Sequence, residues 1–261
     1  YDAVQLFLQR AGFYRGLPAG EPGIAAAARI CRLLDGVPLA LEMAASWSRA
    51  LALDEIAAEI HRGVDFLSSR RADLPARHRS LRAVFDGSWE LLGEKERGVC
   101  RKLALFQGSF RRDAAEQVAG GSLGILAALV DTAFLKWEPS TSRYAMHPLV
   151  HQFAAETWSA DPPDPAESAL RQRHCLYYLS WLSEREPLLH GRRHNEATAQ
   201  ISAEWENIRQ AWDWAVRAPQ VEQIAAAMNG IYRFCESRGW YAEGESLLTK
   251  ALESLTRLNE A

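Results

Sequence analysis

The sequence has 261 residues, of which 48% are hydrophobic and 24% are charged, a balance typical of a folded protein and not of a disordered chain. The formal net charge of −3 excludes a global electrostatic attraction to nucleic acid or to an anionic membrane. No apolar run approaches the roughly 20 residues that span a bilayer, and the length predicts two or three small domains in what we expect to be a piece of a longer product.

The first predicted unit is a small helical bundle over residues 1–62. Apolar residues recur at helical spacing, and Gly36 stands where a helix-stopping residue belongs. Pro38 then fits the first position of the next helix, because its missing N–H costs nothing there. Helices are predicted over 3–11 and 24–34, then from Pro38 and from a cap at Asp54.

A connector over 63–77 leads to the second predicted unit, a winged-helix domain over 78–158 with a small two-stranded wing. The two strand-like runs, FLKWE and SRYAM, surround the turn PSTS, and a closing helix runs from Pro148 to Trp158. Further helices are predicted over 80–92 and 96–106, from a capping-box-like start at Asp113 with Glu116, and from a cap at Ser122.

The third predicted unit is a helical array over 167–261, preceded by a linker over 159–166 that contains DPPDP. The last helix pair fits the tetratricopeptide pattern in part, with Tyr232 where a glycine is expected and Gly244 at a small-residue position. Other residues at signature spacing are Ile231, Gly239, Tyr241, Leu248 and Ala251. The predicted fold class is therefore mainly α: helical bundle, winged helix and tetratricopeptide-like array.

Four cysteines lie at least 60 positions apart, which excludes a CxxC metal or redox motif. Free, mostly buried thiols in a reducing cytoplasm are the simplest interpretation. The cysteines are Cys31, Cys100, Cys175 and Cys235.

The three units in this order resemble the later part of the NB-ARC nucleotide-switch module of STAND signalling ATPases, in the bacterial regulators that join it to tetratricopeptide repeats. The stretches that carry the resemblance include ICRLLDGVPLALEMAAS, LVDTAFLKWE with RYAMHPLVHQFA, and EWENIRQAWDWA. No GxxxxGK[ST] phosphate loop occurs in the sequence. The resemblance implies that a P-loop ATPase domain lies upstream, in a parent that is a slow ATPase, whereas this part has no catalytic residues.

The resemblance also implies cofactor-binding residues for ADP or ATP with Mg in the intact parent, with none bound by this part alone. Gly36 and Pro38 belong to a GxP motif whose proline packs on adenine in the family. His147 stands in MHP, which aligns with the family's MHD signature, where the histidine reaches the β-phosphate of ADP. Pro148 replaces the aspartate of that signature, so this chain lacks the acidic side chain that the family has there.

The expected partners follow from the same resemblance. They are the upstream P-loop domain, a protein or small-molecule inducer at the helical repeats, and further copies of the chain on activation. The expected function is regulation of signalling or transcription, in which closure over the nucleotide is coupled to sensing by the repeats.

Several alternatives compete with this interpretation. Gly36 and Pro38 equally fit a plain helix stop and start. His147 and His151 lie four positions apart, as two zinc ligands on a helix can, but no third ligand follows by motif, so we predict no metal site and a structural role for His151.

A winged helix can also bind DNA, but the stretch from Asp113 to Leu135 contains no Lys or Arg, so we do not expect direct DNA contact by this part. A protein-interaction scaffold with vestigial nucleotide residues is the remaining alternative.

Overall fold

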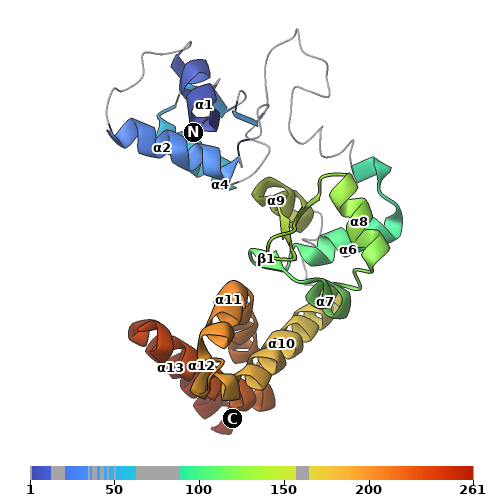
Figure 1. The fold of residues 1–261 in the computed structure, drawn as a ribbon, viewed down its shortest axis with the longest axis vertical. Coiled ribbons are helices and arrows are strands. Elements are labelled where there is room, and N and C mark those ends of the chain that lie inside the picture. Colours follow the sequence, from blue (N-terminus) through green and yellow to red (C-terminus); the bar gives the residue numbers. More distant parts are fainter. Residues whose placement is uncertain are drawn as a thin grey trace. The chain divides into compact units, whose positions relative to one another are not determined.

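The computed structural model describes residues 2–12, 21–34, 36, 40–41, 44–45, 47–49, 51–62, 89–156 and 165–260 (Figure 1). The fold is mainly helical, with a small three-stranded antiparallel sheet, as the sequence predicts. The chain divides into two compact units. Unit 1 comprises Tyr1–Ala104, Ala127–Lys136 and Met146–Trp158, and unit 2 comprises Leu105–Leu126, Trp137–Ala145 and Ser159–Ala261.

The bundle at the start of unit 1 is built around one shared apolar core. Its elements are α1 (Asp2–Gly12), α2 (Glu21–Leu33), the 3-10 turn η1 (Trp47–Arg49) and α4 (Leu53–Arg62). Residues 40–41 and 44–45 are also helical. Phe7, Ile30, Leu41 and Ile56 are fully buried in the shared core. The helices predicted over 3–11 and 24–34 are confirmed.

The predicted cap at Asp54 is wrong. Helix α4 begins one residue earlier, at Leu53, so Asp54 lies inside the first turn and forms an ion pair with Arg29. The backbone N–H of Ala52 donates instead to the Glu55 carboxylate at 2.9 Å, as in half of a capping box. The periodicity therefore located the helix correctly, but the carboxylate that caps its first turn belongs to Glu55 and not to Asp54.

The winged-helix region contributes to both units. Its helices are α6 (Glu94–Leu103), α8 (Leu123–Asp131) and α9 (Pro148–Glu156), and its strands are β1 (Ser109–Phe110), β2 (Leu135–Glu138) and β3 (Arg143–Met146). The strand order is β1-β3-β2, and Ser109 pairs with Ala145. Both predicted strands are confirmed, and β1 adds a third, because two residues are too few to show an alternating pattern. Of the helix predicted over 80–92, residues 80–88 lie outside the described residues.

The segment between β1 and α8 differs from its prediction. Helix α7 (Arg112–Ala114) has Arg111 at its N-cap and continues as the π-helical turn η4 (Ala115–Ala119), so the predicted capping box at Asp113 is wrong. The Asp113 carboxylate instead accepts a hydrogen bond from the Tyr177 hydroxyl at 2.9 Å. The predicted cap at Ser122 is confirmed, since its Oγ accepts from the Ile125 N–H at 3.5 Å.

Unit 2 is completed by the C-terminal helices. These are α10 (Pro165–Arg185), η5 (Glu186–His190), α11 (His194–Arg217), α12 (Val221–Arg238) and α13 (Tyr241–Asn259). A Cβ added at Gly230 would lie 2.8 Å from the Leu182 Cγ of α10, and one at Gly244 would lie 2.9 Å from the Cys235 Cβ of α12. Close packing therefore uses Gly230, whereas Tyr232, where the repeat pattern has glycine, is 45% exposed.

The four cysteines are all free and buried, as the sequence predicts. Burial raises the pKa of the Cys100 and Cys175 thiols to about 12, so both stay protonated and unreactive near neutral pH. Among the helices that the structure describes, we find none with the length and apolar character needed to cross a bilayer.

Candidate functional site

His147 joins strand β3 to helix α9. Its carbonyl oxygen accepts the first helical hydrogen bond, from the His151 N–H at 2.8 Å, so His147 occupies the N-cap position. Pro148 is the first helical residue, where a proline fits without loss of a hydrogen bond. The sequence placed His147 at or just before this helix start, and the structure agrees. The positive end of the helix dipole near this position favours an anion.

The imidazole of His147 contacts the bundle. Its Nε2 lies 3.2 Å from the carbonyl oxygen of Leu34, and both residues belong to unit 1. A carbonyl oxygen can only accept, so the Nε2 must carry the hydrogen and donate. The contact joins residues 113 positions apart in the sequence, and it brings the start of α9 to one particular end of α2 within unit 1.

That end of α2 leads directly into the GxP motif. Leu34 closes the helix by donating its N–H to the Ile30 carbonyl, and Gly36 then donates to the Cys31 carbonyl, each at 3.0 Å. Gly36 has a φ of +70°, in the left-handed region that favours glycine, as its predicted role as a helix stop requires. The Leu34 carbonyl thus lies at the negative end of the α2 dipole, where a histidine N–H is a favourable partner.

Of the three residues predicted to contact a nucleotide, two are described. The His147 side chain contacts the carbonyl oxygen of Leu34, and Gly36 follows Leu34 by two residues in the sequence. Pro38 lies outside the described residues. The assignment of Gly36 and Pro38 to adenine and of His147 to phosphate therefore remains a prediction.

His151 lies one turn further along α9 and is partly buried. The apolar face of this helix carries Phe153, whose ring meets Trp89 edge to face at 5.5 Å, and Trp89 meets Phe134 at 5.6 Å. These contacts make α9 part of a packed aromatic core, and the structural role of His151 stays a prediction. No group of three His, Cys, Asp or Glu side chains suited to a metal ion is present in the described part of the chain.

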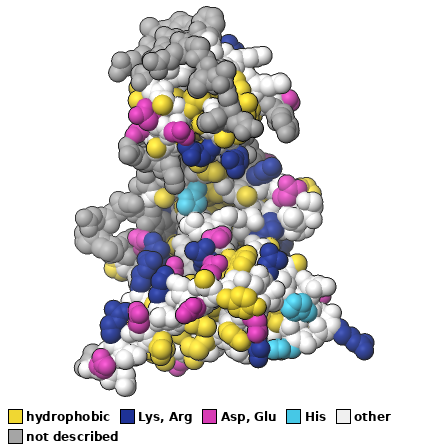
Figure 2. Space-filling model, turned by 90° about the vertical axis from the view of Figure 1, so that its left-hand side faces the viewer, with side chains coloured by type: hydrophobic (Ala, Val, Ile, Leu, Met, Phe, Trp, Pro, Cys, Tyr) yellow, Lys and Arg dark blue, Asp and Glu magenta, His cyan; other side chains and the backbone are white. Residues whose placement is uncertain are grey.

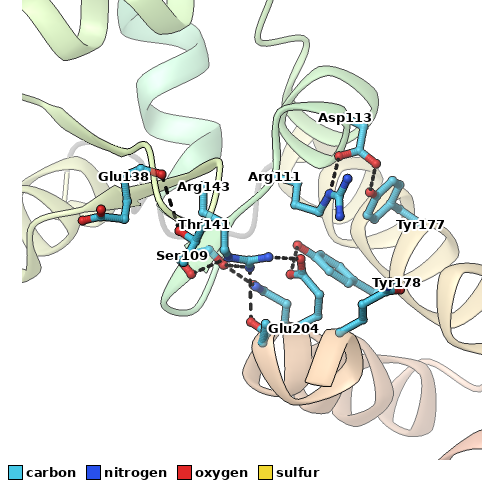
Figure 3. A network of polar contacts seen from close by, with 12 residues as sticks. Ser109, Arg111, Asp113, Glu138, Thr141, Arg143, Tyr177, Tyr178 and Glu204 are labelled. Carbon is cyan, nitrogen blue, oxygen red and sulfur yellow. Dashed lines mark hydrogen bonds and ion pairs between the residues drawn. The ribbon is translucent and has the colours of Figure 1, made fainter. Parts of the chain in front are cut away.

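Sequence analysis missed a buried ion pair in unit 2. Arg143 in β3 is 8% exposed and Glu204 in α11 is 2% exposed, and the two side chains meet at 2.5 Å (Figure 3). A signal was present, because Glu204 falls between Ile201 and Ile208 on the apolar face of its helix. A charged residue in such a stripe indicates a buried partner.

The surface carries mixed charge. On the face drawn in Figure 2, Lys and Arg side chains are interspersed with Asp and Glu, and hydrophobic side chains gather over the C-terminal helices in the lower part of the view. The described residues on that face therefore form no broad basic surface of the kind that binds nucleic-acid phosphates.

Comparison with known proteins gives relatives but no family. No family model matches the chain. Proteins of Mycobacterium tuberculosis and Mycobacterium bovis, each named "Putative HTH-type transcriptional regulator", are 29% identical over 262 aligned residues. That match covers 97% of this chain but only 29% of each relative. An uncharacterised protein of M. tuberculosis is 33% identical over 184 residues, which cover 66% of this chain and 47% of the relative.

Proposed function

We propose that this chain is the regulatory part of a nucleotide-switched transcription regulator. The bundle over 1–62 and the winged helix over 78–158 close on an ADP or ATP molecule that an upstream ATPase domain holds. The helical array over 167–261 senses a partner or inducer and releases the closed state. A chain of this kind has no turnover of its own and little nucleotide affinity, because most phosphate contacts come from the ATPase domain.

The observation that carries the proposal is the contact between His147 Nε2 and the Leu34 carbonyl. A nucleotide that touches both motifs requires them to lie close together, and the contact supports such an arrangement. The Leu34 carbonyl accepts from the same nitrogen that a phosphate oxygen would use. On binding of ADP, the His147 Nε2–H would then donate to a negatively charged phosphate oxygen instead of the Leu34 carbonyl oxygen.

The residues fit a purine nucleotide in chemical character. His147 offers an imidazole N–H at the start of a helix, and Pro38 offers a flat apolar ring for adenine. The magnesium ion and the remaining phosphate contacts would belong to the ATPase domain. Pro148 supplies no carboxylate, so in this chain the closed state depends on the histidine alone within the MHP motif.

A role in transcription is supported by the names of the mycobacterial relatives. The chain spans 29% of their length, so the DNA-binding part of such a protein need not lie within it. Helix α8 is mostly apolar, carries Asp131 as its one charged residue and exposes 58% of Leu123, so it suits a protein neighbour better than a DNA groove. We therefore place DNA contact in another domain of the full-length protein.

The proposal predicts that His147→Ala weakens ADP binding by a chain that includes the upstream domain. Loss of a hydrogen bond to a charged group costs about 1.5–3 kcal/mol, which is roughly 10-fold or more in the dissociation constant. Titration of fluorescently labelled ADP measures the effect. The matched control is His151→Ala, one turn along the same helix, which should bind ADP like the unchanged protein.

Equal ADP affinity of the unchanged protein and of His147→Ala would contradict the nucleotide switch. It would favour the alternative in which the chain is an interaction scaffold with vestigial nucleotide residues. Equal losses in both histidine variants would instead indicate that helix α9 had been disturbed, and His147→Gln, which keeps one N–H donor, would then decide between the two explanations.

A further inference from the structure

The strand that leads to His147 is anchored by one buried arginine. The Arg143 Nη1 donates to the Glu204 carboxylate at 2.5 Å, and its Nε donates to the Ser109 hydroxyl at 2.8 Å (Figure 3). Its Nη2 donates to the backbone carbonyls of Ser109 at 2.7 Å and Ala203 at 3.2 Å. The guanidinium thus binds β1 and α11 at once, and we call Arg143, Ser109 and Glu204 the arginine clamp.

Neighbouring side chains hold the same junction. The Tyr178 hydroxyl donates to the second Glu204 oxygen at 3.3 Å. Asn207, which is 1% exposed, accepts from the Gln107 N–H at 2.8 Å and donates to the Ser109 carbonyl at 3.2 Å. Arg173 of α10 donates to the Val118 carbonyl at 3.1 Å. All of these residues belong to unit 2, so this half of the wing and the helical array form one body.

The arginine clamp destabilises the folded protein unless both buried charges, Arg143 and Glu204, are present. Burial alone would lower the pKa of Arg143, but the hydrogen bond to Glu204 and the carboxylate charge outweigh that effect and raise it. Removing one member leaves an uncompensated buried charge, whereas replacing both by apolar residues can be neutral. The main effect of the Arg143–Glu204 ion pair is therefore to hold β3 in one position against α11, and it adds little to the free energy of unfolding.

The strand continues straight into the proposed nucleotide site. His147 follows Arg143 by four residues, and the chain passes from unit 2 to unit 1 between Ala145 and Met146. Tyr144 and Ala145 are paired with Phe110 and Ser109 of β1. A shift in register would turn every side chain of the strand to the other face. Register pairing and the arginine clamp thus both hold strand β3, which ends at Met146, the residue before His147.

We propose that Arg143 and Glu204 are positioning residues, which tie the helical array to β3 and thereby set the place of His147. This inference rests on the proposed function, since it gives the route by which the array would control the nucleotide contact. In this proposal the array and strand β3 move as one, and their movement is passed along the chain through Met146 to His147.

The first test needs no nucleotide. The imidazole signals of His147 are followed by NMR in the 261-residue chain and assigned by their absence in His147→Ala. We expect Glu204→Gln to shift or broaden the His147 signal. The control is Glu206→Gln, since Glu206 lies on the same helix, is exposed and pairs with Arg209 at the surface. An unchanged His147 signal in folded Glu204→Gln would overturn the inference, whatever the fate of the nucleotide proposal.

The second test uses ADP affinity of the chain that includes the upstream domain. We expect Glu204→Gln to weaken ADP binding about 3- to 10-fold, and to cause no further loss when combined with His147→Ala. Additive losses would mean that the clamp acts independently of His147, and would overturn the inference. If His147→Ala alone has no effect, the nucleotide proposal fails while the NMR test still stands.

A variant that fails to fold does not end the test. The double replacement Arg143→Met with Glu204→Met removes both charges and keeps apolar volume. We expect it to fold and to shift the His147 signal as Glu204→Gln does. A folded double variant with an unchanged His147 signal would contradict the inference as directly as the single variant.

Discussion

At the scale of single residues, His174 is the most unusual titratable group in the described part of unit 2. Its side chain is 1% exposed and packs with two aromatic rings, with ring centroids 5.4 Å from Phe106 and 4.7 Å from Tyr178. Burial lowers the pKa of His174 to about 3, with the nearby Arg171 charge acting in the same direction. The folded protein therefore holds a neutral imidazole beside Tyr178, whose hydroxyl donates to Glu204, throughout the physiological pH range.

The depressed pKa predicts acid sensitivity. Between about pH 6.5, where an unfolded histidine titrates, and about pH 3, the unfolded chain binds a proton that the folded chain does not. The free energy of unfolding should therefore fall as pH falls through this window, by up to about 1.4 kcal/mol per pH unit from this group. Urea unfolding at a series of pH values measures the slope.

His174→Phe should remove this part of the slope, since it keeps a ring in the aromatic cluster without a titrating nitrogen. His190→Gln serves as the control, because the His190 side chain is 50% exposed. Identical pH slopes for the unchanged protein and for His174→Phe would show that folding does not lower the pKa of His174, and would contradict the prediction.

At the scale of elements, the packing of α12 on α10 depends on Gly230. The 2.8 Å approach to the Leu182 Cγ means that Gly230→Ala must displace a fully buried side chain. Overpacking of this kind costs about 1–3 kcal/mol, which outweighs the gain of about 1 kcal/mol from alanine in a helix. We predict a lower melting temperature for Gly230→Ala.

Gly98→Ala provides the opposite case. Gly98 lies in α6, and a Cβ there meets nothing within 4 Å, so only the helix-propensity gain applies and the melting temperature should rise or stay the same. A Gly230→Ala protein as stable as Gly98→Ala would mean that α12 and α10 are not packed as closely as described.

The sequence predicted the elements unevenly, for physical reasons. Long amphipathic helices such as α6 and the paired strands β2 and β3 follow from periodicity, and Ser122 follows from capping chemistry. The two-residue strand β1 and the π-helical turn η4 carry no periodic signal. Acidic residues at Asp54 and Asp113 were mistaken for caps because an ion pair and a cap favour the same residue types near a helix start.

The candidate site was predictable in part. The N-cap position of His147 follows from Pro148 next to it, which is a local rule. Its contact with Leu34 could not be read from composition or spacing, because a distant backbone carbonyl accepts the bond. Glu204 could have been singled out by its place in an apolar stripe, but its partner on a β-strand could not.

At the scale of the whole molecule, acidic and basic residues are nearly equal in number, with a net charge of −3, and the chain forms two compact units. The unit boundary runs through the winged-helix region and falls beside His147. The central claim is that His147 reads the phosphate of a nucleotide held next to the end of α2.

An experimental structure of the chain with its upstream domain and bound ADP tests this claim most directly. We predict a His147 ring nitrogen within about 2.7–3.2 Å of a phosphate oxygen, with Pro38 against the adenine ring. A structure with ADP fully bound and the His147 imidazole still on the Leu34 carbonyl, away from every phosphate oxygen, would contradict the claim.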